Sequence, residues 1–171
     1  METGLRRKKI LEIIQSSGNC ITGSKLATML NVERQVVLED IALLRASGLN
    51  IAATPSGYMM ISAVNKKRPA RVFTCSHQTP EQTEKELMIM VENGGLVRDV
   101  IIEHPIYGEI TGMLMLSTSD DVKNIMERLK SKDSRPLSST TGGIHMHTVE
   151  AETEEALEKI EIALREEGLL A

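Results

Sequence analysis

Three short helical segments fill the first 48 residues, and each ends at a residue that suits a helix stop. Apolar residues recur at three- and four-residue spacing in RRKKILEIIQSSG, GSKLATML and ERQVVLEDIALLRAS. Gly18 and Gly48 suit the ends of the first and third segments, and Thr22 can cap the second. Only Asn31 and Val32 separate the second segment from the third. Two helices joined by so tight a turn predict a helix-turn-helix.

The third segment leads directly into a short hairpin signal, NIAATPSGYMMI. Two β-prone runs flank TPSG, which places Pro55 second and Gly57 fourth in the turn. A hairpin after the third helix is a wing, so we predict a winged helix-turn-helix domain over residues 1–64 that binds duplex DNA. A three-helix core that serves only protein contacts is the alternative.

The third helix of this domain is expected to enter the major groove of DNA. It would present Arg34 to guanine edges and Gln35 to adenine edges, with Leu38 beside them. Glu33 and Glu39 on the same helix would repel phosphates. Basic residues on the first two helices are candidates for phosphate contacts. They are Arg6, Arg7, Lys8, Lys9 and Lys25.

Charge is divided unevenly along the chain. Residues 1–68 carry a net charge of +5 and residues 69–171 a net charge of −9, which favours a polyanion as partner of the first part only. Aromatic residues make up 2% of the chain, which argues against a surface that stacks single-stranded bases. No apolar run reaches the ~18 residues of a membrane span. Cys20 and Cys75 form no spacing motif, which favours a cytoplasmic protein with two unpaired thiols. The N-terminal stretch METGLRRKKILEII has no long apolar region with a cleavage site, so we expect no signal peptide.

A domain boundary is expected near residues 64–68, where a basic run precedes Pro69. Beyond it, strand-like and helix-like segments follow in the order strand, helix, strand, strand, helix, strand, helix. Ser119 is expected to cap the second helix, and residues 135–143 to form a loop or short strand. This order predicts an α+β domain over residues 69–171, an open antiparallel sheet with helices on one face.

Two of the four histidines lie one residue apart in the final predicted strand, GIHMHTVEA. Residues two apart in a strand share a face, so His145 and His147 project together and supply half of a metal site. His77 at the end of an earlier strand and Glu86 on the following helix could complete it. Three nitrogens and one carboxylate suit zinc, nickel or a similar divalent cation. Paired histidines that only form hydrogen bonds are the alternative.

The remaining histidine, His104, lies in EHPIYGEI directly before a proline. One interpretation is a turn residue that hydrogen-bonds the backbone. The other is a ligand for an effector beside the metal. The residues alone leave both open.

Several stretches of the chain resemble a known family of regulators. ERQVVLEDIALLRASGLNIAATPSGYMM is similar to the helix-turn-helix and wing of the biotin-repressor type. SHQTPEQTEKEL, NGGLVRDVIIEHPIYGEI and GGIHMHTVEA, in this order, are similar to the three-histidine domain. Over about residues 5–170 the chain therefore resembles the niacin-responsive repressors of NAD biosynthesis, the NiaR family. It departs from the family in a QTP segment one residue longer, and in Glu33 where a small capping residue is expected.

The resemblance implies a cytosolic bacterial repressor, not an enzyme, that binds operator DNA of NAD biosynthesis and niacin uptake genes as a homodimer. It implies a second domain similar in fold to the histidine-containing phosphocarrier proteins. That domain would sense nicotinic acid as corepressor and hold one divalent transition metal per chain, nickel or zinc. The family's metal ligands map onto His77, Glu86, His145 and His147, with Glu84 as a rival to Glu86.

Nicotinate is expected to bind where the final strand meets the first helix of the second domain. The metal could take its ring nitrogen or its carboxylate, and Gly142 and Gly143 could direct backbone N–H groups at the carboxylate, with His104 as a further effector contact. Alternatives are a metal-dependent enzyme for a small pyridine compound with Glu103 or Glu109 as base, a phosphorylatable regulator, and a metal-responsive regulator. The enzyme lacks sequence support, because the chain has no His-Glu-x-x-His motif or nucleophile elbow.

Overall fold

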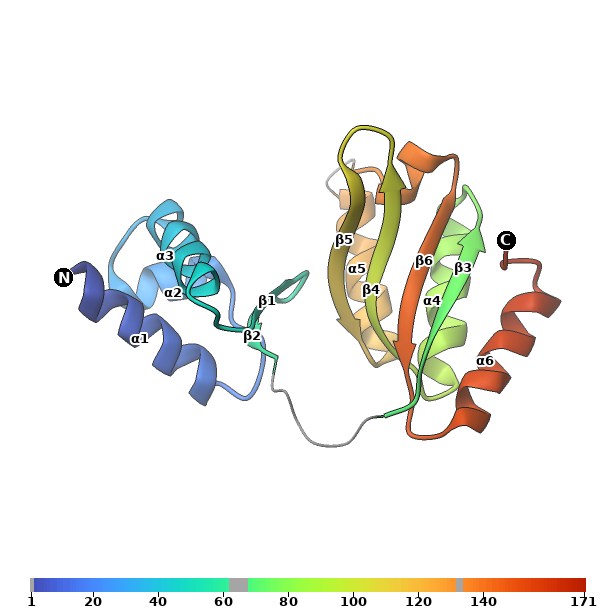
Figure 1. Ribbon diagram of the computed structural model, residues 1–171, viewed down its shortest axis with the longest axis horizontal. Coiled ribbons are helices and arrows are strands. Elements are labelled where there is room, and N and C mark those ends of the chain that lie inside the picture. Colours follow the sequence, from blue (N-terminus) through green and yellow to red (C-terminus); the bar gives the residue numbers. More distant parts are fainter. Residues whose placement is uncertain (1, 62–67, 132–133) are drawn as a thin grey trace. The chain divides into compact units, whose positions relative to one another are not determined.

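The computed structural model describes residues 2–61, 68–131 and 134–171. The chain divides into two compact units, Met1–Asn65 and Lys66–Ala171, shown in Figure 1. Each unit has its own hydrophobic core. The boundary expected near residues 64–68 falls almost wholly outside the described residues.

The first unit is a winged helix-turn-helix, as predicted. Its helices are α1 (Thr3–Ser16), α2 (Gly23–Leu30) and α3 (Arg34–Ala46), and its wing is the antiparallel hairpin of β1 (Ile51–Thr54) and β2 (Gly57–Met60). The Thr22 hydroxyl accepts the Lys25 N–H at 3.1 Å and caps α2 as expected. Asn31 ends α2 in the left-handed region with a φ of 52°, which turns the chain sharply into α3.

The core of the first unit follows the predicted helical spacing. Ile10, Leu26 and Ile41 are at most 1% exposed and join the three helices. The wing packs on this core through Tyr58, and β2 pairs there with Ile21. Gly57 permits the pairing, because a Cβ atom at this position would lie 2.5 Å from the Ile21 carbonyl oxygen.

A buried carboxylate ties α1 to α3. Asp40 is 2% exposed, and its oxygens accept hydrogen bonds from Arg6 Nε at 2.5 Å and Arg7 Nε at 3.0 Å. Burial alone would raise the pKa of Asp40, but the two guanidinium groups outweigh it and lower the pKa below its usual value. Both arginines, expected at DNA phosphates, therefore also hold the domain together.

We expect Asp40→Asn to lower the free energy of unfolding of the first unit by about 1–3 kcal/mol at neutral pH, because two guanidinium groups lose their charged partner. The carboxylate has a lowered pKa in the folded state. Its contribution is therefore complete above the unfolded pKa of about 3.9 and lost as pH falls through the folded value. Urea denaturation at several pH values measures this. Glu39→Gln, an exposed neighbour, should change stability by less than about 0.5 kcal/mol. Equal effects of the two variants would contradict the prediction.

The second unit is built on a four-stranded antiparallel sheet in the order β3–β6–β4–β5. The strands are β3 (Ala70–Ser76), β4 (Leu96–His104), β5 (Gly108–Leu116) and β6 (Ile144–Glu150). β6, the last strand in sequence, lies between β3 and β4. Its register with β3 places Cys75 opposite His145 and Phe73 opposite His147.

Three helices cover one face of this sheet, as Figure 1 shows. They are α4 (Pro80–Glu92), α5 (Ser119–Ser131) and α6 (Glu154–Glu166). Leu87 from α4, Met126 from α5 and Leu157 from α6 are at most 3% exposed and belong to one core. The predicted α+β class, with an antiparallel sheet and helices on one face, is confirmed.

Two local predictions are wrong. The side chain that caps α5 is Thr118 rather than Ser119, because the Thr118 hydroxyl accepts the Asp121 N–H at 3.1 Å and Asp121 accepts the Thr118 N–H at 3.0 Å. Residues 137–141 form a short 3-10 helix, η1 (Leu137–Thr141), rather than a loop or strand. Threonine hydroxyls at its end stabilise it by bonding carbonyls three residues back.

Candidate metal centre and effector site

Four side chains from three segments converge inside the second unit. His77 follows β3, Glu86 lies on the inner side of α4, and His145 and His147 lie on β6. None of them is more than 6% exposed. The predicted alternation of β6 is confirmed, since both of its histidines are buried while Ile144 on the opposite face is 54% exposed.

The Glu86 carboxylate lies at the centre of the group. Its Oε2 atom is 2.6 Å from His77 Nε2, 3.2 Å from His145 Nε2 and 3.6 Å from His147 Nε2. The imidazole rings are neighbours as well, with centroids 4.8 Å apart for His77 and His145 and 4.9 Å apart for His145 and His147. The three histidines and one glutamate thus form a single buried cluster.

Backbone oxygens fix the orientation of the two β6 imidazoles. His145 Nδ1 lies 2.9 Å from the Gly143 carbonyl oxygen, and His147 Nδ1 lies 2.6 Å from the Asp99 carbonyl oxygen. A carbonyl only accepts, so each Nδ1 carries the proton and each Nε2 is left to face Glu86. Metal-ligating histidines commonly make this second hydrogen bond.

Contacts within the cluster shift the pKa values of Glu86 and His145. Burial alone would raise the pKa of Glu86, but the three histidines outweigh it and hold the pKa well below its usual value. Burial alone would lower the pKa of His145. The hydrogen bond to Glu86 and the negative charge of Glu86 outweigh burial and raise the pKa of His145 above its usual value. The cluster therefore combines an ionised carboxylate with an imidazole that readily carries a proton.

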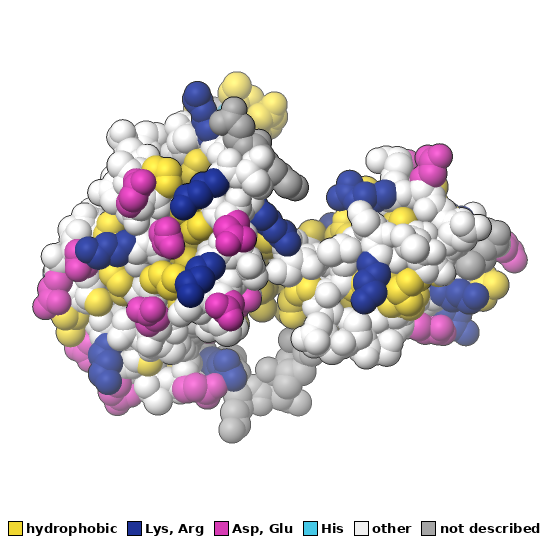
Figure 2. All heavy atoms as spheres, turned by 180° about the vertical axis from the view of Figure 1, so that it is seen from behind, with side chains coloured by type: hydrophobic (Ala, Val, Ile, Leu, Met, Phe, Trp, Pro, Cys, Tyr) yellow, Lys and Arg dark blue, Asp and Glu magenta, His cyan; other side chains and the backbone are white. Residues whose placement is uncertain are grey.

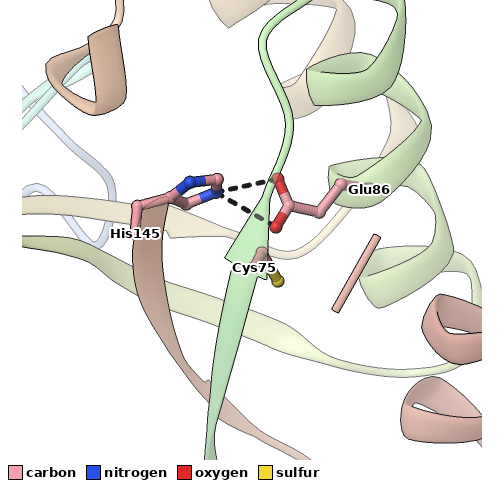
Figure 3. Close-up of side chains that lie close together, drawn as sticks. All are labelled: Cys75, Glu86 and His145. Atoms are coloured by element: carbon pink, nitrogen blue, oxygen red, sulfur yellow. Dashed lines mark hydrogen bonds and ion pairs between the residues drawn. The ribbon is translucent and has the colours of Figure 1, made fainter. Parts of the chain in front are cut away.

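Cys75 lies beside Glu86 and His145, as Figure 3 shows, and is 0% exposed. Burial raises the pKa of its thiol, and the negative charge of Glu86 raises it further. Cys75 is not among the site residues predicted from the sequence. The available signal is its spacing of two from His77, which in an alternating strand places both on one face.

The donor set fits a divalent transition metal. Zinc lies about 2.0–2.2 Å from imidazole nitrogen and carboxylate oxygen, so neighbouring donors of a tetrahedral site lie roughly 3.3 Å apart. The Nε2–Oε2 separations of 2.6–3.6 Å bracket that value. One ligand atom each from Cys75, Glu86 and His145 lie within 4.8 Å of one another, so the described residues include a buried group that could hold a metal ion.

Gly142 and Gly143 form the turn into β6, and their backbone N–H groups do not point in the direction expected for contacts with an effector. Both N–H groups donate to the Ser138 carbonyl oxygen, Gly143 at 2.8 Å, instead of pointing at an effector. Gly143 supports the cluster through its carbonyl oxygen, which accepts from His145 Nδ1 and, at 3.3 Å, from the His77 N–H. Its φ is +98°, and a Cβ atom there would lie 2.3 Å from the His77 carbonyl oxygen, so only glycine fits.

A cavity of about 260 Å³ adjoins the cluster, and all four side chains line it. The rest of its lining is mostly apolar: Leu87, Val100, Leu114, Ile125, Leu129 and Leu137. Pockets that take drug-sized molecules measure about 300–1,000 Å³. The cavity therefore suits a smaller molecule with an apolar face.

Two other predicted residues lie apart from this cavity. His104 ends β4, and its Nδ1 accepts the N–H groups of Ile106 at 3.2 Å and Tyr107 at 3.3 Å. This is the turn role of the two considered, and His104 does not line the cavity. Glu84 does not line it either, whereas Glu86 does, so Glu86 is the carboxylate that the structure brings to the histidines.

Candidate DNA contacts lie on the surface of the first unit. Arg34 and Gln35 in the first turn of α3 and Lys25 on α2 are exposed, and Leu38 is half-buried. Glu33 is the N-cap residue of α3 and forms no side-chain cap, as its departure from the family pattern suggests. On the helical face of the second unit, acidic and basic side chains are interspersed, as Figure 2 shows.

The chain combines a winged helix-turn-helix, a fold typical of DNA-binding proteins, with an α+β domain that contains a buried polar cluster beside a small cavity. Residues 6–59 match an HTH domain family, and residues 70–171 match the 3H domain family. The chain is 41% identical over 165 residues to a probable transcription repressor NiaR of Thermotoga maritima, covering 96% of this chain and 93% of that protein. It is 37% identical over 167 residues to the transcription repressor NadR of Bacillus subtilis, covering 96% and 92%.

The chain therefore belongs to the NiaR/NadR family of transcription repressors, which confirms the resemblance seen in its motifs. Both relatives are named as repressors, in agreement with the prediction of a regulator rather than an enzyme. Among residues 2–61, 68–131 and 134–171, no helix has the length and apolar character needed to cross a membrane.

Proposed function

We propose that this protein is a cytoplasmic repressor of NAD biosynthesis and niacin uptake genes. Residues 1–64 bind operator DNA, the protein acts as a homodimer, and residues 69–171 sense nicotinic acid as corepressor. The observation that carries the proposal is a buried cluster of three histidines and one glutamate lining a small apolar cavity, in a chain that also contains a winged helix-turn-helix. The similarity to the NiaR and NadR repressors supports it.

His77, Glu86, His145 and His147 would hold one nickel or zinc ion per chain. When bound, such an ion supplies a coordination position for the nitrogen or carboxylate of a pyridine carboxylate. Gly143 and Asp99 already direct the two β6 imidazoles with Nε2 toward Glu86, so these donors need little rearrangement. The ionised carboxylate of Glu86 matches a cation in charge.

The first unit would read DNA through α3 in the major groove. Arg34 and Gln35 stand exposed at the start of that helix, where base edges are contacted, and Lys25 is available to a phosphate. In a homodimer, two such helices read half-sites one or two turns of DNA apart. A small change in their relative placement then alters the fit to both half-sites at once.

Nicotinate would act by preferring the DNA-binding arrangement of the dimer. Effector coupling typically amounts to about 1–3 kcal/mol, which corresponds to roughly a 5- to 150-fold change in operator affinity. Since coupling is reciprocal, operator DNA should tighten nicotinate binding by the same factor.

The test is operator affinity measured by fluorescence anisotropy at fixed salt. The probe is a duplex that the full-length protein itself selects from a random pool, with nickel or zinc present. We expect nicotinate to tighten binding at least about 5-fold, and Arg34→Ala with Gln35→Ala to abolish preference for the selected duplex over a scrambled one.

Two outcomes of this experiment count against the proposal. Unchanged affinity with nicotinate would reject nicotinate as corepressor. A response to the metal alone, abolished by chelator and indifferent to nicotinate, would instead identify a metal-responsive regulator, which the buried cluster by itself also permits.

A further inference from the structure

The lining of the apolar cavity beside the cluster includes one positively charged side chain, which has no part in the proposed metal site. Arg135 lines the cavity, between the end of α5 and the start of η1. Among the described residues that line it, Arg135 is the only lysine or arginine. It is exposed, and no side-chain hydrogen bond or ion pair engages it within the described parts of the chain.

The chemistry of the cavity wall defines what kind of molecule suits this arginine. Leu114 and Leu129 contribute apolar surface to the lining, while Glu86 and the three histidines contribute polar groups. A guanidinium group binds a carboxylate through two parallel charge-assisted hydrogen bonds. A small aromatic acid satisfies both surfaces, because its ring packs on the leucines and its carboxylate pairs with Arg135.

We infer that Arg135 is the residue that makes this site select a pyridine carboxylic acid over the matching amide. The inference rests on the proposed function and adds the specificity determinant to it. The matching amide is neutral, and its NH₂ group would face the N–H donors of Arg135. Compared with the carboxylate, the amide therefore lacks the negative charge and one of the two acceptor oxygens. The expected contacts of Gly142 and Gly143 with the carboxylate are not available to replace Arg135, since both N–H groups donate to Ser138.

Gly112 provides an independent check that the ring occupies this cavity. Gly112 lies on β5 in the lining, and a Cβ atom there would meet Val100 Cγ1 at 3.4 Å and Leu137 Cδ1 at 3.5 Å. These are ordinary van der Waals contacts, so Gly112→Val adds volume to the wall in a strand that tolerates a branched side chain. It should weaken binding of the acid and the amide alike.

The experiment is titration calorimetry of nicotinate and nicotinamide into the full-length protein loaded with nickel or zinc. We compare wild type with Arg135→Gln, Arg135→Lys and Gly112→Val. Arg128→Gln is the matched control, because Arg128 is exposed near the end of α5 and does not line the cavity. Metal content and thermal unfolding temperature are measured for every variant.

The wild type is expected to prefer the acid, and Arg135→Gln to weaken nicotinate binding about tenfold while leaving nicotinamide within about twofold. The effect is about tenfold rather than larger because solvent screens an exposed arginine. Arg135→Lys keeps the positive charge but loses the paired donors of the guanidinium group. Its affinity for nicotinate should therefore lie between those of the wild type and Arg135→Gln. Arg128→Gln should match the wild type.

Unchanged nicotinate affinity in Arg135→Gln, with wild type binding the acid, would overturn the inference and leave the proposed function standing. Equal losses of acid and amide in Arg135→Gln would also overturn it. A wild type that binds neither compound would overturn both the inference and nicotinate sensing. Full metal content in Arg135→Gln is required, because Arg135 is not one of the metal donors.

Discussion

Replacing Glu86 with glutamine is expected to weaken zinc or nickel binding by about 100-fold. The amide has nearly the same size, so the fold should persist, but the anionic donor at the centre of three imidazoles is lost. A structural zinc site contributes about 10–16 kcal/mol in total, so one of four ligands accounts for about 3 kcal/mol, which corresponds to roughly 100-fold. Competition with a chromophoric chelator measures the affinity, and circular dichroism confirms folding.

Glu84→Gln is the matched control for this variant. Both residues lie on α4, two positions apart, and Glu84 does not line the cavity that Glu86 lines. Metal affinity in Glu84→Gln should equal that of the wild type. If Glu84→Gln loses the metal and Glu86→Gln keeps it, the assignment of the carboxylate ligand is wrong.

Gly143→Ala is expected to disturb stability and metal binding together. A Cβ atom at Gly143 would lie 2.3 Å from the His77 carbonyl oxygen, and φ is +98°, so the turn must shift. The shift would break the hydrogen bonds that Gly143 O accepts from His145 Nδ1 and from the His77 N–H. We expect a loss of about 3 kcal/mol in unfolding free energy and at least about tenfold in metal affinity.

Gly142→Ala separates this effect from the general cost of a left-handed backbone. Gly142 has a φ of +66°, and a Cβ atom there has no atom within 4 Å. It should cost about 1–2 kcal/mol of stability and leave metal affinity unchanged. Chemical denaturation measures the stability of both variants, and chelator competition measures their metal affinity. Equal metal affinities of Gly142→Ala and Gly143→Ala would contradict a role of Gly143 in supporting the metal donors.

Residue pattern alone predicted much of the fold and half of the cluster. Alternation in β6 is enough to put His145 and His147 on one buried face, since the side-chain period of a strand is two. Residue pattern offered His77 and Glu86 only as candidates. Their assignment came from the family motifs, because nothing in local spacing indicates which helix residue meets a strand elsewhere in the sheet.

Contacts made by the backbone and across long sequence separations escaped prediction. The carbonyl oxygens of Asp99 and Gly143 orient two imidazoles, but every residue has such an oxygen, so the sequence carries no mark of it. Asp40 and Arg6 lie 34 positions apart. Helical period places each residue on its own helix but does not predict that they meet, so the sequence indicates only a DNA-contacting role for Arg6.

The central position of β6 has a consequence for how the cluster exchanges its contents with solvent. Strand β6 has a hydrogen-bonded neighbour on both edges, β3 and β4. Amide protons of such a strand are normally among the last in a domain to exchange with deuterium, because they are released only by large-scale opening. The two histidines on β6 thus lie on a strand that is expected to open slowly. Under the proposed function, a metal ion or nicotinate is therefore expected to enter and leave the cavity without opening of the sheet.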